Sequence, residues 1–182
     1  AIITGIKEPE EKIKLLKRFE SSYPGSPLLT ASWMAIADTY MEGERFTQAK
    51  PFLEKIIANE KSMQLLPQAY LKLGIAHYNS DKNEAAREQF AYVLDNFSNS
   101  EEAADALDGL KAIYIEEGRS AEFIDFVRSK GLSLSASLAD SLRFTAAEQL
   151  YANKSFDQAE QALEQYLAAE DRPAFAIEAY AM

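Results

Sequence analysis

Cysteine is absent from this sequence of 182 residues, and histidine occurs once. Without cysteine the chain has no disulfide framework, no zinc-finger or iron–sulfur spacing and no thiol nucleophile. Basic residues are also few, since 29 acidic residues outnumber 19 basic ones and give a formal net charge of −10. This balance argues against a protein that binds nucleic acid or an anionic membrane surface through Lys and Arg.

Glycine and proline are scarce, at seven and six residues, and no apolar run reaches the roughly 18 to 20 residues of a membrane-spanning helix. Apolar residues make up 47% of the chain and aromatic residues 11%, so it can bury a core. Residues 1–7 lack the basic and apolar regions of a signal peptide, which favours a processed or trimmed start. We therefore expect one domain of long helices.

An internal repeat runs through the chain. Placing Tyr40, His77, Tyr114 and Leu150 in one column gives steps of 37, 37 and 36 residues. The column four residues earlier and the column thirteen residues later are then wholly apolar. Their members are Ile36, Leu73, Leu110 and Ala146, and Leu53, Phe90, Val127 and Leu163. Because turn-forming residues separate two helical segments in each copy, the spacing predicts four helix–turn–helix units.

The first two copies share a large aromatic residue, an apolar residue followed by a small one, and a second ring. They read Trp33-x2-Ile36-Ala37-x2-Tyr40 and Tyr70-x2-Leu73-Gly74-x2-His77. This pattern resembles the tetratricopeptide repeat, a unit of two antiparallel helices. The resemblance implies an all-α fold, an α-α solenoid in which the helix pairs form a right-handed superhelix.

Small residues on the two helices of a repeat predict close approach of the helix axes. They are Ala37, Gly74 and Ala147 on the first helices, which we expect opposite Ala49, Ala86 and Ala159 on the second. The third copy has Lys111 and Phe123 at these positions, so we expect its hairpin to open or shift. Gly131 should end its second helix early, and Pro51 should lie in a first turn or kink its helix.

The predicted organisation is an array fragment with a half-repeat at each end. It comprises the end of a preceding repeat (1–27), repeat 1 (28–64), repeat 2 (65–101), a degenerate repeat 3 (102–137), repeat 4 (138–172) and the start of a further helix (173–182). Residues 1–6 are expected to be the remnant of a first helix, and 10–22 a second helix. Since neither terminus has the polar character of a capping helix, we expect a window from a longer array.

Two links between repeats carry a narrower resemblance. The segments Tyr23 to Ser26 and Phe97 to Ser100 share an aromatic residue and a Ser three positions later. Together with the period, they resemble a subset of these repeats in bacterial cell-envelope proteins, such as the Tol-Pal division coordinator and the outer-membrane assembly lipoprotein. This implies a periplasmic or outer-membrane-associated protein.

No residue pattern points to catalysis. His77 lies in the column of Tyr40 and Tyr114, so we interpret it as a semi-buried packing residue and not as a base or metal ligand. A cluster of acids is expected to stabilise the start of a first helix instead of binding calcium. These acids are Glu101, Glu102, Asp105 and Asp108. We predict a protein without enzymatic activity, cofactor or metal.

The resemblance implies that partners contact three columns of the first helices. Carried onto this sequence, these positions are Met34, Asp38, Met41, Leu71, Ile75, Tyr78, Asp108, Ala112, Ile115, Phe144, Glu148 and Tyr151. None is basic, which does not support capture of a peptide carboxylate. Met, Tyr and Phe with scattered acids predict a peptide or protein partner with apolar anchors and some positive charge.

We therefore predict a non-catalytic protein–protein interaction scaffold that binds a peptide or protein in the concave groove of the array. Two alternatives remain open. The chain can be a docking or regulatory segment of a larger enzyme or secretion machine, or a helical enzyme in which the apparent repeats have no functional meaning. The sequence leaves the partner and the oligomeric state undetermined.

Overall fold

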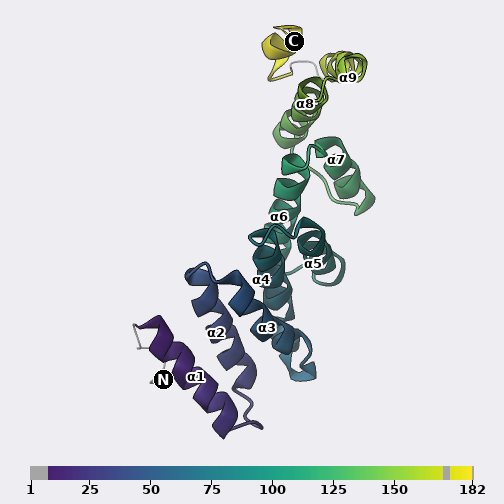
Figure 1. Ribbon diagram of the computed structural model, residues 1–182. Helices are drawn as coiled ribbons and strands as arrows, with labels where there is room; N and C mark the ends of the chain where they lie inside the picture. The colour runs from purple at the N-terminus through teal and green to yellow at the C-terminus, as the bar shows by residue number, and fades with distance from the viewer. Residues whose placement is uncertain (1–7, 170–172, 182) are drawn as a thin grey trace. The chain divides into compact units, whose positions relative to one another are not determined.

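The computed structural model describes residues 8–169 and 173–181, and these residues contain helices and no strands. The predicted all-α class is thus confirmed for this part of the chain. Figure 1 shows the helices in chain order. They are α1 (Pro9–Ser22), α2 (Leu29–Glu42), α3 (Phe46–Ile57), the 3-10 helix η2 (Glu60–Leu65), α4 (Leu66–Tyr78), α5 (Asn83–Asn96), α6 (Glu102–Glu116), α7 (Ser120–Ser129), α8 (Ala136–Ala152), α9 (Phe156–Ala169) and α10 (Ala176–Ala181).

The helices follow the predicted repeat order. The pairs α2/α3, α4/α5 and α6/α7 lie within the ranges 28–64, 65–101 and 102–137, whereas α8 begins two residues before the predicted boundary at 138. Helix α1 occupies the place of the expected second helix at 10–22, and the expected remnant at 1–6 lies outside the described residues. The repeat boundaries themselves remain a prediction.

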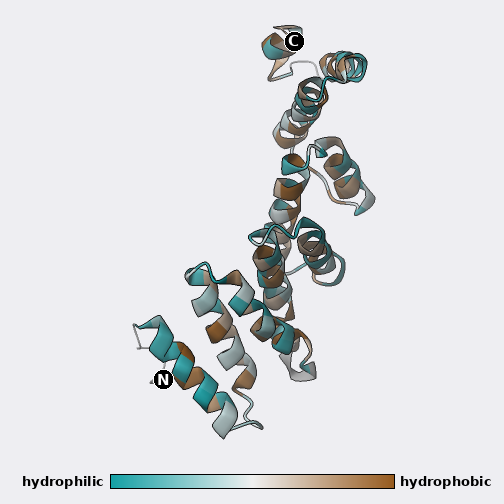
Figure 2. Cartoon of the chain, in the orientation of Figure 1, coloured by the Kyte–Doolittle hydropathy of each residue, from teal (hydrophilic) through white to brown (hydrophobic). Residues whose placement is uncertain are grey.

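The chain forms two compact units, Ala1–Leu110 and Lys111–Met182, and the division falls within α6. Each unit has its own buried side chains, because the amphipathic helices place apolar residues on one side, as the alternating colours of α1 in Figure 2 illustrate. In unit 1, Ile36, Leu53 and Phe90 are almost completely buried. In unit 2 the same is true of Phe123 and Tyr166. The predicted apolar column of Leu53, Phe90, Val127 and Leu163 is buried in all four copies.

The turn inside each repeat has the same backbone geometry. The fourth residue after the aligned column of Tyr40, His77, Tyr114 and Leu150 has a positive φ in every copy. The values are 56° at Glu44, 56° at Asp81, 72° at Gly118 and 62° at Lys154. The next residue donates its N–H to the carbonyl of the residue in that column, as in Arg45 to Tyr40 at 2.8 Å and Arg119 to Tyr114 at 2.7 Å. This pattern is a Schellman cap, which satisfies carbonyls at the helix end.

Three of these four caps place a residue with a side chain in the left-handed region, which favours glycine. We expect Lys154→Gly and Glu44→Gly to raise the free energy of unfolding by about 0.5–1 kcal/mol each, as optimised caps commonly do. We expect Gly118→Ala to lower it by about 1 kcal/mol, because alanine is strained at this φ. Urea denaturation followed by circular dichroism measures all three.

The control for these caps is Gly43→Ala, because Gly43 is the C-cap of α2 with a φ of −92°. The nearest neighbour of its new methyl group is Nε of the Arg45 side chain at 3.3 Å, and the carbonyl oxygens of Thr39 and Tyr40 lie at an ordinary contact distance of 3.7 Å. If Gly43→Ala were as destabilising as Gly118→Ala, backbone strain would not explain the difference.

The two links with similar sequences also have the same hydrogen bonds. Ser26 donates its N–H to the carbonyl of Tyr23 at 3.0 Å, and Ser100 donates to Phe97 at 2.9 Å. Tyr23 and Phe97 in turn donate to carbonyls four residues earlier, at 2.9 and 2.8 Å. The links are therefore structurally equivalent turns at the end of a helix.

Two local predictions have clear outcomes. Helix α7 ends at Ser129 and Gly131 has a φ of +67°, so the predicted early end of this helix is confirmed. Pro51 lies inside α3, beyond its first turn, so the first-turn alternative was wrong. Proline at this position leaves the carbonyl of Thr47 without its helical donor, but Thr47 is exposed and water can replace that bond.

In repeat 2 the nearest neighbour of the small residue Gly74 is the phenyl ring of Phe90. A Cβ atom built on Gly74 would lie 2.5 Å from Cε1 of Phe90, and its three nearest atoms all belong to that ring. Gly109 of α6 faces the same ring, at 2.7 Å. Gly74 thus opposes the phenyl ring one turn beyond Ala86, because the bulk of Phe90 fills the space left by both glycines.

Candidate interaction surface

Three of the twelve predicted contact positions belong to the core. Met34, Leu71 and Phe144 expose only 6%, 7% and 5% of their surface. Met34 is part of the buried cluster that includes Ile13 of α1, and Phe144 stacks on Phe175 with a centroid distance of 4.8 Å. These three side chains stabilise helix packing, so the expectation that they contact a partner was wrong.

The other nine predicted positions keep some exposed surface, and their role in binding remains a prediction. In unit 1 the half-buried positions are Asp38, Met41, Ile75 and Tyr78, and the exposed one is Asp108. In unit 2 the half-buried position is Ala112, and the exposed ones are Ile115, Glu148 and Tyr151. We name the unit 1 set, without Asp108, the α2/α4 surface. Met41, Ile75 and Tyr78 give it apolar character.

An ion pair links the two helices of the α2/α4 surface. Lys72 Nζ of α4 lies 2.9 Å from Oδ1 of Asp38 on α2, and both side chains are half-buried. Lys72 was missed because it lies outside the three columns carried over from the family. Because Lys72 balances the charge of Asp38, Asp38 gives no reason to expect a basic partner on this surface.

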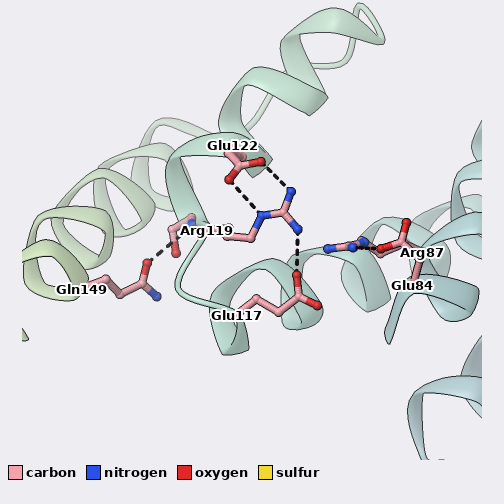
Figure 3. Close-up of polar contacts among 7 residues, drawn as sticks. Glu84, Arg87, Glu117, Arg119, Glu122 and Gln149 are labelled. Carbon is pink, nitrogen blue, oxygen red and sulfur yellow. Dashed lines mark hydrogen bonds and ion pairs between the residues drawn. The ribbon is translucent and has the colours of Figure 1, made fainter. Parts of the chain in front are cut away.

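In unit 2 a glutamine that the sequence reasoning missed fixes the turn between α6 and α7. Gln149 Nε2 of α8 donates to the carbonyl of Ile115 at 2.9 Å, and its Oε1 accepts from the N–H of Ser120 at 3.5 Å. Figure 3 shows Gln149 beside this turn. The side-chain amide thus joins α8 to the turn that follows the predicted contact residue Ile115.

Arg119 gives the same turn a second set of contacts. Its guanidinium binds both carboxylate oxygens of Glu122, at 2.9 and 2.6 Å, and reaches Glu117 at 2.9 Å (Figure 3). It also lies over the Tyr114 ring at 5.2 Å from the centroid. These hydrogen bonds to Glu122 and Glu117 raise the pKa of Arg119, which therefore stays charged at all practical pH values.

His77 is a half-buried residue of α4 with an electropositive neighbourhood. Burial lowers the pKa of its imidazole below the ordinary 6.5, and the charges of Lys50 and Lys82 lower it further against opposing effects of Glu54 and Glu88. Its Nδ1 is buried and has no hydrogen-bond partner within the described part of the chain. A neutral packing role fits these surroundings, as the repeat column suggested.

The lowered pKa predicts a pH dependence of stability. As pH falls from 7.5 to 5.5, His77 takes up a proton in the unfolded chain before it does so in the folded chain. Its contribution therefore lowers the free energy of unfolding as pH falls through 6.5 toward the pKa of the folded state. We expect His77→Tyr to be tolerated at pH 7.5 and to become progressively more stable relative to the parent at lower pH. Melting temperatures of both proteins across this range test this; parallel curves would contradict it.

The described residues include no candidate metal site. No three His, Asp or Glu side chains among residues 8–169 and 173–181 are placed to hold a metal ion. Glu102 begins α6, and Glu101, Asp105 and Asp108 are exposed around its first two turns, where carboxylates stabilise a helix N-terminus. None of the helices in these ranges is long and apolar enough to cross a membrane.

Comparison with known proteins finds a family match in the second helix pair. Residues 68–100, from α4 to the link after α5, match the family model of the tetratricopeptide repeat. The sequence has no significant match among curated proteins.

Two solved structures with tetratricopeptide or similar repeats resemble most of the chain. The C-terminal part of a TPR repeat-containing protein from Cytophaga hutchinsonii has a TM-score of 0.57 at 14% identity, covering 90% of this chain and 60% of that one. A protein from Podospora anserina assigned as a kinesin light chain, with nearly identical TPR-like repeats, has a TM-score of 0.52 at 17% identity, covering 88% and 85%. The predicted α-α solenoid class is thereby confirmed, and this chain spans 60% of the length of the Cytophaga structure.

Proposed function

We propose that this chain is a non-catalytic scaffold that binds a peptide or protein segment on the exposed positions of its first helices. Solenoids of tetratricopeptide repeats generally mediate protein–protein interactions and present such surfaces for recognition. The observation that carries the proposal is the α2/α4 surface, where Met41, Ile75 and Tyr78 remain partly exposed beside the Asp38–Lys72 ion pair.

This surface suits a partner with apolar anchors and no strong net charge. Methionine adapts its shape to different side chains, and tyrosine offers a large ring with a hydroxyl group. The ion pair supplies one charge of each sign within 2.9 Å, so polar groups of either sign can be accommodated. An extended or helical segment with Leu, Met or aromatic anchors fits this chemistry.

The test begins with a phage-displayed peptide library selected against the purified chain, followed by calorimetry with the selected peptide. We expect Tyr78→Ala or Ile75→Ala to weaken binding by about 2 kcal/mol or more, as loss of an anchoring contact does. Glu54→Ala and Lys55→Ala, at exposed positions of α3, should change the affinity little. The opposite result, with α3 variants disruptive and α4 variants neutral, would refute the proposed surface.

We further propose that the chain is part of a larger bacterial cell-envelope protein, periplasmic or associated with the outer membrane. The support is the equivalence of the Tyr23–Ser26 and Phe97–Ser100 links in sequence and hydrogen bonding. Fractionation of the source cells with an antibody against this chain tests the location, and recovery in the cytosol would contradict it. The alternative, a docking segment of a larger enzyme or secretion machine, predicts a catalytic domain in the same polypeptide.

A further inference from the structure

Two tyrosine rings of unit 1 stack directly on each other. Tyr70 of α4 and Tyr92 of α5 have a centroid distance of 4.1 Å and an interplanar angle of 28°. At this distance carbon atoms of the two rings are in van der Waals contact. Phe97 packs beside both rings, with centroid distances of 6.4 and 6.1 Å. Neither tyrosine is a predicted partner-contact position, and the proposed function does not use the pair.

The hydroxyl ends of the two rings also lie together. Burial raises the pKa of the Tyr70 phenol, and a hydrogen bond with the side chain of Tyr92 raises it further. Tyr70 is therefore a neutral phenol at neutral pH. Because the hydrogen bond joins the hydroxyl ends of stacked rings, the ring carbons next to the hydroxyl groups are close to one another. These are the carbons that carry unpaired-electron density when a phenol is oxidised to a phenoxyl radical.

The pair combines access from solvent with a partner already in contact. Tyr92 exposes 40% of its surface, whereas Tyr70 is half-buried. Tyr23 and Tyr151 are exposed as well, but each packs against a phenylalanine ring, which has no hydroxyl group to oxidise. The chain also has no cysteine thiol to consume an oxidant first.

The repeat register shows that this pair is particular to repeat 2. The equivalent residues of repeat 1 are Trp33 and Lys55, whose ammonium group lies over the indole ring at 5.7 Å from the centroid. The equivalent residues of repeats 3 and 4 are Leu107 with Ser129, and Arg143 with Gln165. The packing position therefore does not require two tyrosines, and repeat 2 alone combines two phenols there.

We propose that Tyr70 and Tyr92 are a modification site at which a one-electron oxidant joins the two rings as dityrosine. Each phenol gives one electron to the oxidant and one proton to water, so two equivalents of oxidant are consumed. The two phenoxyl radicals then form one carbon–carbon bond between the carbons next to their oxygens. The hydrogen on each joined carbon moves to its own oxygen as a proton, which restores two phenols. The chain thus loses two hydrogen atoms in total.

The new bond cross-links the helix pair at the end opposite its turn. Tyr70 lies in the first half of α4 and Tyr92 in the second half of α5, whereas residues 79–82 connect the two helices. Closing the loop between residues 70 and 92 reduces the conformational freedom of the unfolded chain. The modification therefore stabilises repeat 2 under oxidising conditions, in a chain that has no disulfide.

The test is photo-oxidation of the purified full chain with ruthenium(II) tris-bipyridyl and persulfate, which withdraw single electrons from tyrosine. We expect dityrosine fluorescence in chains that remain monomeric on a denaturing gel. Trypsin cleaves after Lys61, Lys72, Arg87 and Lys111, so the two rings fall on the separate peptides 62–72 and 88–111. Mass spectrometry should find these two peptides joined, with a mass two hydrogen atoms below their sum.

The variants keep the rings and remove one hydroxyl group at a time. Tyr70→Phe and Tyr92→Phe should each lower the yield of monomeric dityrosine at least about tenfold, because the remaining tyrosines are not held in contact. The matched control is Tyr23→Phe, which removes a hydroxyl group from a ring that is 60% exposed and should leave the yield unchanged.

The effect on stability is measured by circular dichroism after identical oxidation of the parent and Tyr92→Phe. We expect oxidation to raise the melting temperature of the parent by about 10 °C relative to its effect on Tyr92→Phe. An unchanged melting temperature of the cross-linked monomer would overturn the stabilising role.

Two other results would overturn the site itself. One is dityrosine confined to covalent dimers, and the other is a monomer yield that neither Tyr70→Phe nor Tyr92→Phe lowers. Neither result bears on the α2/α4 surface, since the peptide-binding test uses other residues.

Discussion

Replacing Gly74 by leucine should destabilise unit 1 by about 3 kcal/mol, the upper end of the usual cost of overpacking. Even the Cβ atom of alanine would lie 2.5 Å from the Phe90 ring, which is 98% buried and cannot move into solvent. We therefore expect Gly74→Ala, and equally Gly109→Ala on the other side of the ring, to cost about 1–2 kcal/mol. Trp33, the single tryptophan, is partly buried against the unit 1 core and reports its urea unfolding by fluorescence.

A rescue experiment distinguishes overpacking from loss of helix structure. Phe90→Leu removes the ring, so Gly74→Ala should be much less destabilising in that background than in the parent. Gly25→Ala is the control, since no atom lies within 4 Å of its new methyl group. Equal costs of Gly74→Ala in both backgrounds would show that the Phe90 contact is not responsible.

Phe123→Ala should destabilise unit 2 by about 3–5 kcal/mol, the typical cost of deleting a buried phenyl ring. The repeat pattern alone suggests the opposite, because the other copies have Ala49, Ala86 and Ala159 in this column. In the structure, however, Phe123 is fully buried and its ring lies 5.8 Å from that of Tyr114. Alanine would leave a cavity in a hairpin that is built around the ring.

Circular dichroism during urea unfolding measures this effect, with Trp33 fluorescence as an internal reference for unit 1. The control on the same helix is Arg128→Ala, whose ion pair with Asp125 is largely exposed and should contribute less than about 1 kcal/mol. An unchanged or increased stability of Phe123→Ala would mean that the third repeat can return to the family packing.

The repeat register could be derived from the sequence because it depends on local chemistry. Apolar columns and turn residues recur with the period, and the structure gives the same cap to Glu44, Asp81, Gly118 and Lys154. The early end of α7 followed from one glycine, Gly131. These features require no knowledge of which helices lie beside one another.

The candidate surface was harder to predict because exposure depends on neighbouring repeats. Met34, Leu71 and Phe144 are buried by packing that the column rule did not include. The missed polar contacts have a regular spacing in the sequence. Three contacting pairs are separated by 34 residues, namely Asp38 and Lys72, Ile115 and Gln149, and Asp140 and Ala174. Pairs at this separation, one turn short of the period, identify neighbours across successive repeats.

The position of Phe90 between two glycines has a consequence for cooperativity. In a linear array, stability is the sum of each repeat's own free energy and the coupling between neighbours. One ring here contributes to both, because it contacts Gly74 within its repeat and Gly109 at the start of the next. A smaller side chain at this position would therefore weaken the coupling as well as the repeat, and unit 1 would unfold in segments over a broader transition.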